Sequence, residues 1–239
     1  MSRPIFLSAY WRHLALLNYE VDPYLLKPHL PAGTELDFLN GKTYISLVAF
    51  LFEQTSLFGK IPAFFHRNFE EVNLRFYVVR KENDQIKRGV VFIKEIVPKP
   101  FLAWVARTFY KENYISMPMS HNIEIGNSYN YVWDEHSLFV KTEDKVFTAA
   151  PNSPERWITE HYWGYTKIND QKTLEYEVQH PIWNLYKILD YKVDVNIASL
   201  YGPQFTETFN QKPTSQFLAD GSKVTVHWPK KVPGTFSSP

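Results

Sequence analysis

The alternation of apolar and polar residues is most regular from residue 69 to residue 78, which reads Phe-Glu-Glu-Val-Asn-Leu-Arg-Phe-Tyr-Val. Successive side chains of a β-strand point to opposite faces, so this pattern predicts a strand with one apolar and one polar face. The two faces carry four residues each, namely Val72, Leu74, Phe76 and Val78 against Glu71, Asn73, Arg75 and Tyr77. The polar row forms either a solvated surface or the wall of a polar pocket, and the pattern alone leaves both open.

Further strands are expected through most of the chain. A strand at 86–97 would pair with 71–81 across Asn83-Asp84, and Asn40-Gly41 is a strong turn signal between strands at 35–39 and 42–53. Shorter alternating stretches predict strands at 116–124, 129–134, 137–142, 145–149, 174–179 and 223–228.

Short helices are predicted where proline or a capping residue precedes an apolar stretch. Asp22-Pro23 begins one that Pro28 and Pro31 end, Pro100 begins a second, and Ser153 caps a third that reaches about residue 162. The stretch 182–200 is ambiguous, and we expect it to be helical in part. Many antiparallel strands with few helices indicate a β-rich α+β fold whose sheet is closed or nearly closed.

No linker or repeat divides the chain, so we expect one domain over residues 1–239. Three prolines between residues 228 and 239 suggest a loose tail from about residue 229. Aromatic residues make up 17% of the chain, which favours strands and is enough to fill a large core.

Composition excludes several classes of function. The chain has no cysteine, which rules out disulfides, thiol catalysis and cysteine-ligated metal sites. Its net charge is +1 without a basic block, so nucleic acid is not an expected partner. Arg12 and His13 interrupt any apolar leader, and the longest apolar run, 44–52, is about half of the ~20 residues that a spanning helix needs. A cytoplasmic protein without a membrane partner is therefore expected.

The candidate chemistry centres on a few polar residues. Glu71 and Arg75 stand about 13 Å apart along the strand, so each needs another partner if the face is buried. Arg107 lies in an apolar helix, either as a carboxylate-binding guanidinium or as a solvated residue of an amphipathic helix. None of the eight histidines has metal-ligand spacing, and His180, before Pro-Ile-Trp, is the most suggestive of them. Walker, GxGxxG and GxSxG motifs are absent, so we expect neither a metal nor a cofactor and assign no catalytic residue.

The chain resembles the YqjF-like family of uncharacterised proteins, in the acetoacetate-decarboxylase-like superfamily. The order and spacing of several segments carry the resemblance over nearly the whole chain. They are Trp11, Asn-Tyr-Glu-Val-Asp-Pro at 18–23, Leu-Pro-Ala-Gly-Thr-Glu-Leu-Asp at 30–37, Tyr-Ile-Ser-Leu-Val-Ala-Phe at 44–50, Glu-x-Asn-x-Arg-x-Tyr-Val at 71–78, Gly-Val-Val-Phe at 89–92, Ala-Arg at 106–107, Tyr114, Glu-His-Tyr at 160–162 and His-Pro-Ile-Trp at 180–183.

The resemblance implies a large antiparallel sheet rolled into a cone or barrel around a polar cavity. It also implies a place to look for the decarboxylase's paired lysines, one of which forms a Schiff base while the other lowers its pKa. The comparable segment here is 107–115, where Tyr114 and Ile115 stand in place of the lysines and Lys111 is beside Glu112. We therefore expect no imine chemistry, although Lys94 alternates with apolar residues and is a rival candidate.

The leading hypothesis is a pocket that binds a small anionic metabolite. Arg75 and Arg107 would hold the anion within about 12 Å of each other, and Glu71 would pair with an arginine or act as a base. The ligand-binding set is completed by Asn73, Tyr77, Tyr114 and His180. The first rival is a lyase or isomerase that uses acid–base chemistry on a small oxo-acid. The second is an interaction protein with a structural polar core. The oligomeric state and the ligand stay open.

Overall fold

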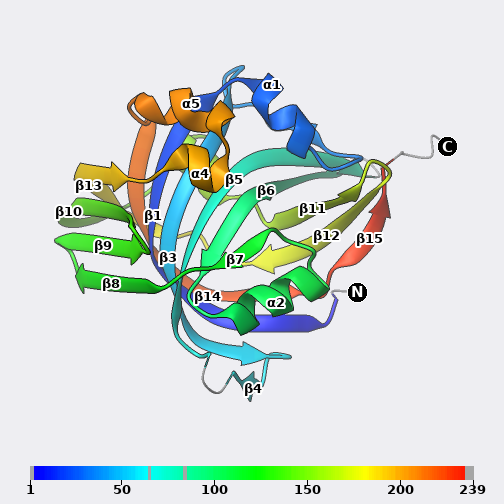
Figure 1. Ribbon diagram of the computed structural model, residues 1–239, viewed down its shortest axis with the longest axis horizontal. Helices are drawn as coiled ribbons and strands as arrows, with labels where there is room; N and C mark the ends of the chain where they lie inside the picture. Colours follow the sequence, from blue (N-terminus) through cyan, green and yellow to red (C-terminus); the bar gives the residue numbers. More distant parts are fainter. Residues whose placement is uncertain (1–2, 64–65, 83–84, 235–239) are drawn as a thin grey trace.

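The structure is a computed structural model that describes residues 3–63, 66–82 and 85–234. Its described strands form one fifteen-stranded sheet (Figure 1). In chain order they are β1 Ile5–Val21, β2 Glu35–Leu36, β3 Thr43–Leu57, β4 Ile61–Pro62, β5 Phe69–Glu82, β6 Gln85–Val97, β7 Tyr114–Ser116, β8 Met119–Glu124, β9 Ser128–Trp133, β10 His136–Thr148, β11 Trp163–Asn169, β12 Lys172–Gln179, β13 Asn184–Asp194, β14 Ser215–His227 and β15 Lys230–Pro233.

The described helices are short. They are α1 Pro23–Leu26, η1 Lys27–His29, α2 Pro100–Phe109, α3 Pro154–Thr159, α4 Ile197–Tyr201, η2 Pro203–Phe205 and α5 Thr206–Asn210. No helix among the described residues is long and apolar enough to cross a membrane.

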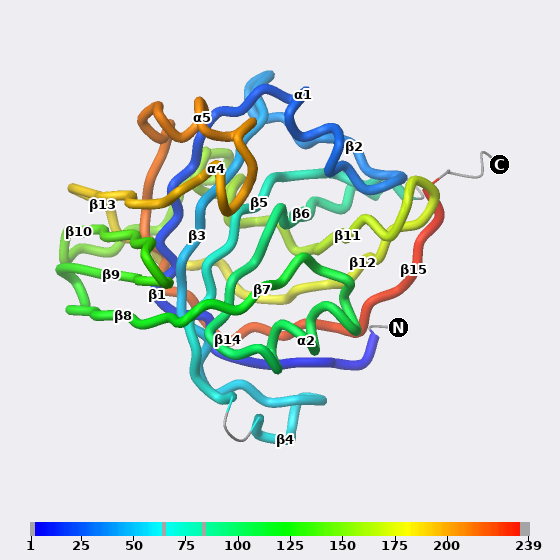
Figure 2. Tube along the Cα trace, in the orientation of Figure 1, coloured from blue at the N-terminus to red at the C-terminus, as the bar shows by residue number. Residues whose placement is uncertain are grey.

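Seven strands close into a ring in the order β12-β11-β6-β5-β3-β1-β14. The closing contact is the antiparallel pairing of β12 with β14, through Val178 opposite Val226 and Gln179 opposite Thr225. Beyond the ring, the sheet continues from β14 through β13 and β10 to β9 and β8, which project to one side (Figure 2). The expected rolled, β-rich fold is confirmed, although β6 pairs in parallel with both β11 and β7, so the sheet is mixed.

Strand β5 shows why the ring has a core on both faces. Val72, Leu74, Phe76 and Val78 have no exposed surface and belong to an outer apolar cluster that also holds residues of α4 and η2, such as Leu200 and Phe205. Alternate residues of the same strand therefore point to the inside of the ring. The apolar row is buried as expected, but the same cluster also holds Tyr131 and Trp133 of β9, so helices form only part of what packs with it.

The local signals gave most helix starts correctly. Asp22 caps α1 by accepting a hydrogen bond of 2.8 Å from the amide of Tyr24, and Ser153 caps α3 through the amide of Arg156. Helix α2 begins at Pro100, as expected. Strands β5 and β6 pair as the predicted hairpin, whose turn at 83–84 lies outside the described residues.

Two expectations about the strands were wrong. Only one bridge, Leu39 to Lys42, forms at the Asn40-Gly41 turn, because β2 pairs with β5 instead of β3. The stretches 137–142 and 145–149 form one strand with an irregular register. The ambiguous stretch 182–200 is helical in part, as expected, because α4 begins at Ile197, although most of it is the strand β13. Within the expected loose tail, residues 230–233 form the strand β15, which pairs with β12 and buries Val232.

A buried ion cluster fastens β15 to the ring. Glu175 on β12 is fully buried and lies 3.2 Å from the amine of Lys87, 3.1 Å from that of Lys230 and 3.7 Å from Arg80 Nε. A carboxylate without exposed surface needs such partners, because an unpaired buried charge is very costly. The cluster holds β5, β6, β12 and β15 together away from the interior of the ring.

Candidate functional site

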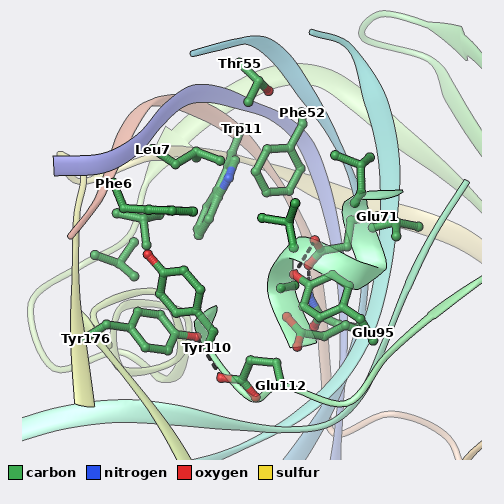
Figure 3. A pocket seen from close by; sticks show the side chains of 18 of the residues that line it. Phe6, Leu7, Trp11, Phe52, Thr55, Glu71, Glu95, Tyr110, Glu112 and Tyr176 are labelled. Carbon is green, nitrogen blue, oxygen red and sulfur yellow. Dashed lines mark hydrogen bonds between the residues drawn. The ribbon is translucent and has the colours of Figure 1, made fainter. Parts of the chain in front are cut away.

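The ring encloses a cavity of about 510 Å³ whose walls are mainly aromatic. Figure 3 shows Phe6, Leu7, Trp11 and Phe52 on one side and the carboxyl groups of three glutamates on the other. The volume lies in the range of small-molecule sites, which combine apolar walls with a few polar groups. The polar groups that line this cavity are Glu71, Asn73, Arg75, Glu95, Glu112, Tyr110, Tyr114, His66, His161, Tyr176 and His180, together with Thr55 and Thr159.

Strand β5 presents three of its four predicted polar residues to the cavity. Glu71, Asn73 and Arg75 line it and are almost fully buried, which fits the pocket-wall interpretation of the alternating pattern. Tyr77 also faces inward but does not line the cavity, so its predicted position is wrong. The rings of Trp157 and His161 cover it at centroid distances of 4.9 and 4.6 Å, because α3 packs across this end of the strand.

Glu71 is held by two hydrogen bonds. Asn73 Nδ2 donates to Oε1 over 3.1 Å and the Tyr114 hydroxyl donates to Oε2 over 2.9 Å. Burial raises the pKa of Glu71 to about 7, against the opposing effects of these bonds and of Arg75. The carboxyl of Glu71 therefore exchanges a proton close to neutral pH.

Two further glutamates share the cavity, and sequence analysis assigned no role to either. Burial raises the pKa of Glu112 to about 8, although Thr166 Oγ1 and the Tyr176 hydroxyl donate to its Oε1 over 2.5 and 3.0 Å. Burial, followed by repulsion from Glu112 and Glu71, raises the pKa of Glu95 well above its ordinary value. Paired carboxyls in a dry site with separated pKa values are typical of proton-transfer chemistry.

A β-bulge in β6 brings Glu95 into the cavity. Leu74 is opposite Lys94, but Arg75 is opposite Phe92, so Ile93 is the extra residue between them. An extra residue in a strand reverses the side of the sheet to which each following side chain points. Glu95 consequently joins Phe92 in the cavity, while Lys94 turns to the outer face and donates to the carbonyl of Leu200.

Glu112 enters the cavity because the chain turns sharply after helix α2. Lys111 has a φ of 58°, in the left-handed region, which ends the helix and reverses the direction of the next side chain. Lys111 itself is exposed. No lysine lines the cavity among the described residues, and the expected lack of imine chemistry stays a prediction.

Arg75 is the cation of the cavity wall, and it is 8% exposed. Among the described residues its guanidinium makes neither a hydrogen bond nor an ion pair, and its Nε is buried without a partner. The ring of Tyr77 lies 6.0 Å from its Cζ. Buried arginines are normally paired, so this guanidinium lacks the oxygen ligands that its position requires.

Tyr114 and His180 line the cavity, as predicted, but Arg107 does not. His180 stacks on Trp183 at 4.0 Å, and burial lowers its pKa to about 4, so it is neutral at pH 7. Helix α2 turns Leu102, Val105 and Ala106 toward the cavity, whereas Arg107 lies on another face and is exposed. The expectation that Arg107 reaches the cavity is wrong, because the amphipathic helix keeps its cation in solvent.

His161 was also missed as a wall residue. Its Nε2 lies 3.1 Å from Asp37 Oδ2, and Arg88 Nε lies 3.3 Å from the same oxygen. Burial lowers the pKa of His161 despite this contact. Within the described ranges, no group of three or more His, Asp or Glu side chains is arranged to hold a metal ion.

Comparison with known proteins identifies the family of this chain. Residues 8–223 match the DUF2071 family, described as an uncharacterized conserved protein. The chain is 28% identical to the uncharacterized protein YqjF of Bacillus subtilis (strain 168) over 200 residues, which cover 79% of this chain and 78% of YqjF.

Solved structures share the fold at low sequence identity. Acetoacetate decarboxylase of Legionella pneumophila superposes with a TM-score of 0.65 at 13% identity, covering 95% of this chain and 87% of the decarboxylase. The enduracididine biosynthesis enzyme MppR gives 0.66 at 10% identity, covering 99% and 90%. The match over 8–223 and the shared cone of strands lead to one conclusion: the chain belongs to the DUF2071 family of YqjF-like proteins and has the acetoacetate-decarboxylase-like fold.

Proposed function

We propose that the cavity binds a small molecule that has an anionic head group and an apolar body. The unpartnered, buried guanidinium of Arg75 carries this proposal. A carboxylate is the group that satisfies a guanidinium best, because two of its oxygens accept the parallel hydrogen bonds of the planar fork.

The neighbouring glutamates do not cancel the charge of Arg75 at pH 7. The pKa of Glu112, raised to about 8, keeps most of this carboxyl protonated, and burial also raises the pKa of Glu95 well above its ordinary value, while Glu71 is ionised in about half of the molecules. The cavity therefore offers an anion the charge of Arg75, which Glu71 offsets only in part, and several hydrogen-bond donors. The aromatic walls, which include Phe50, Trp11 and Trp183, favour an apolar body over a second charged group.

A structural neighbour supports a small acid as the kind of ligand. MppR, at 10% identity, has been solved in complex with pyruvate, and its fold matches this chain with a TM-score of 0.64. Since the identity is low, the neighbour supports only the capacity of this fold to enclose a small oxo-acid.

Three matched probes test the proposal. Phenylbutyrate, phenylbutanol and phenylbutylamine share an apolar body and differ in the charge of the head group. In a thermal-shift titration at pH 7 we expect phenylbutyrate to stabilise the protein most, and a probe at 100 times its Kd adds about 2.7 kcal/mol. Arg75→Gln should lose this stabilisation, whereas Arg107→Gln should keep it, because Arg107 lies outside the cavity.

Preference for the amine over the carboxylate would contradict the anionic head group. Equal stabilisation of the Arg75→Gln variant and the unaltered protein by phenylbutyrate would show that Arg75 does not bind the head group. If none of the three probes shifts the melting temperature, binding of an anion with an apolar body is refuted, and an interaction protein whose polar core is structural gains support.

A second function, acid–base catalysis of the lyase or isomerase type, is favoured by the three proton-exchanging glutamates. A carboxylate such as ionised Glu71 would take a proton from the carbon next to a ketone, and a neutral carboxyl such as Glu95 would donate one to the enolate oxygen. Exchange of α-ketobutyrate protons in deuterated water, followed by NMR, tests this. We expect exchange above the solvent rate that Glu71→Gln abolishes, and an unchanged rate would refute the catalytic role.

A further inference from the structure

The mouth of the cavity is marked by residues that both line it and remain exposed. They come from helix α2 and from the turn after β3, which lie near each other in Figure 1. Phe58, Phe101, Trp104 and Phe109 line the cavity and are between 40% and 53% exposed. Exposure of several large aromatic rings in one place is typical of an interaction site.

These rings, here called the rim, form two groups of contacts, and helix α2 contributes to both. Phe101 stacks with Trp104 at 5.8 Å and with His66 at 5.1 Å. Phe58 and Phe109 both contact Trp228, at 6.2 and 5.7 Å. The rim therefore joins α2 to the segment that contains β4 and to the end of β14, instead of consisting of isolated exposed side chains.

Positive charge is concentrated in the same two segments. Residues 57–69 and 99–111 contain Lys60, Arg67, Lys99, Arg107 and Lys111 and no aspartate or glutamate. Of the two carboxylates that follow these segments, Glu112 is buried in the cavity and Glu70 hydrogen-bonds to His121, so only Glu70 could offset the cations at the surface. Five lysines and arginines in two segments that contain no aspartate or glutamate are a local excess of positive charge in a chain whose net charge is +1.

We propose that this rim docks on an anionic lipid surface, with the cavity opening toward the bilayer. Tryptophan and phenylalanine side chains enter the boundary between head groups and acyl chains, and lysines and arginines around them contact anionic head groups. Docking would let an apolar ligand pass between the bilayer and the cavity without crossing water. The inference goes beyond ligand binding and does not depend on Arg75.

A second copy of the chain fits the rim less well. In a two-fold dimer the same patch would face itself, which would bring two sets of five cations together. Like charges across an interface cost several kcal/mol. An anionic surface instead complements both the aromatic and the basic character of the rim.

Vesicle co-sedimentation with the full chain tests the proposal. The vesicles are phosphatidylcholine alone or phosphatidylcholine with one-third phosphatidylglycerol. We expect binding to the anionic vesicles that exceeds binding to the neutral ones and that weakens as salt is added. The double variant Lys60→Glu/Arg107→Glu should bind at least about tenfold less, since each cation near the surface contributes substantially. Phe101→Ser/Trp104→Ser should also reduce binding.

The matched control is Lys145→Glu/Lys212→Glu, which changes the net charge equally at exposed lysines away from the rim. It should retain binding. Equal losses in both charge variants would refute docking through the rim, because overall charge would then explain the attraction. Equal binding to both kinds of vesicle, or a soluble dimer that Phe101→Ser/Trp104→Ser dissociates, would likewise overturn the proposal. Size-exclusion chromatography and circular dichroism establish that each variant is folded.

Discussion

Replacing Glu112 by glutamine should stabilise the protein at neutral pH and leave its stability unchanged in acid. The folded protein holds the proton of this carboxyl more tightly than the unfolded chain, since burial raises its pKa from 4.5 to about 8. The folded state is thus favoured below pH 4.5 and loses stability as the pH rises toward 8. Glutamine keeps an oxygen that accepts from Thr166 and Tyr176 but never ionises.

The size of the effect follows from the pKa difference. Each pH unit between the unfolded and folded pKa values costs the folded state about 1.4 kcal/mol, so at pH 7.5 the penalty on Glu112 is about 4 kcal/mol. Water that enters the cavity would partly solvate the carboxylate and reduce this penalty. We therefore expect Glu112→Gln to raise the free energy of unfolding by about 2 to 4 kcal/mol at pH 7.5.

Urea unfolding followed by tryptophan fluorescence at pH 4.5 and pH 7.5 measures this difference. Glu135→Gln, in the exposed turn between β9 and β10, is the matched control and should have little effect at either pH. A Glu112→Gln variant that is no more stable than the original protein at pH 7.5 would refute the claim that burial holds this carboxyl protonated at a cost to the folded state. A gain of the same size at both pH values would assign the effect to packing instead of protonation.

Three further predictions concern the buried ion cluster, a close backbone contact and the reactivity of the lysines. Glu175→Gln should destabilise the protein by about 3 kcal/mol in urea unfolding, because it removes the buried carboxylate that Lys87, Lys230 and Arg80 share. A change under about 1 kcal/mol would show that water already solvates the cluster. Gly221→Ala should unfold the protein or lower its melting temperature sharply, since φ at Gly221 is +84° and a Cβ there would lie 1.9 Å from the carbonyl oxygen of Trp11. An unchanged melting temperature would exclude that close approach. Borohydride reduction with acetoacetate should give no adduct by intact mass, because no lysine among the described residues lines the cavity, and a stoichiometric adduct on Lys94 or Lys111 would contradict this.

Some features follow from the sequence because they depend on neighbours along the chain. The alternation in 69–78 fixes which residues of β5 share a face, and the capping residues Asp22 and Ser153 mark where helices begin. Both signals arise from backbone geometry that repeats every two residues or closes within one turn. The number of predicted strands indicated a closed or nearly closed sheet, and the resemblance to YqjF-like proteins added the cone around a polar cavity, but neither specified which strands pair.

Other features were decided by contacts between distant segments. Strand β15 forms because Val232 is buried and Lys230 reaches Glu175, and neither contact is visible in a proline-containing tail. Arg107 lies outside the cavity because the whole helix is oriented by its apolar face. Tyr77 is covered because α3 packs over the end of β5.

The candidate site shows the same division most clearly. The sequence by itself determined that Glu71, Asn73 and Arg75 share one face, because the pleat of a strand leaves no other arrangement. Only the tertiary structure decided that Glu95 is inside and Lys94 outside, because a single bulged residue in β6 reverses the alternation, and a bulge depends on the register with the neighbouring strand. It also decided that Glu71, Glu95 and Glu112 line one cavity, because they come from segments that only the fold brings together. Their raised pKa values follow from that shared burial.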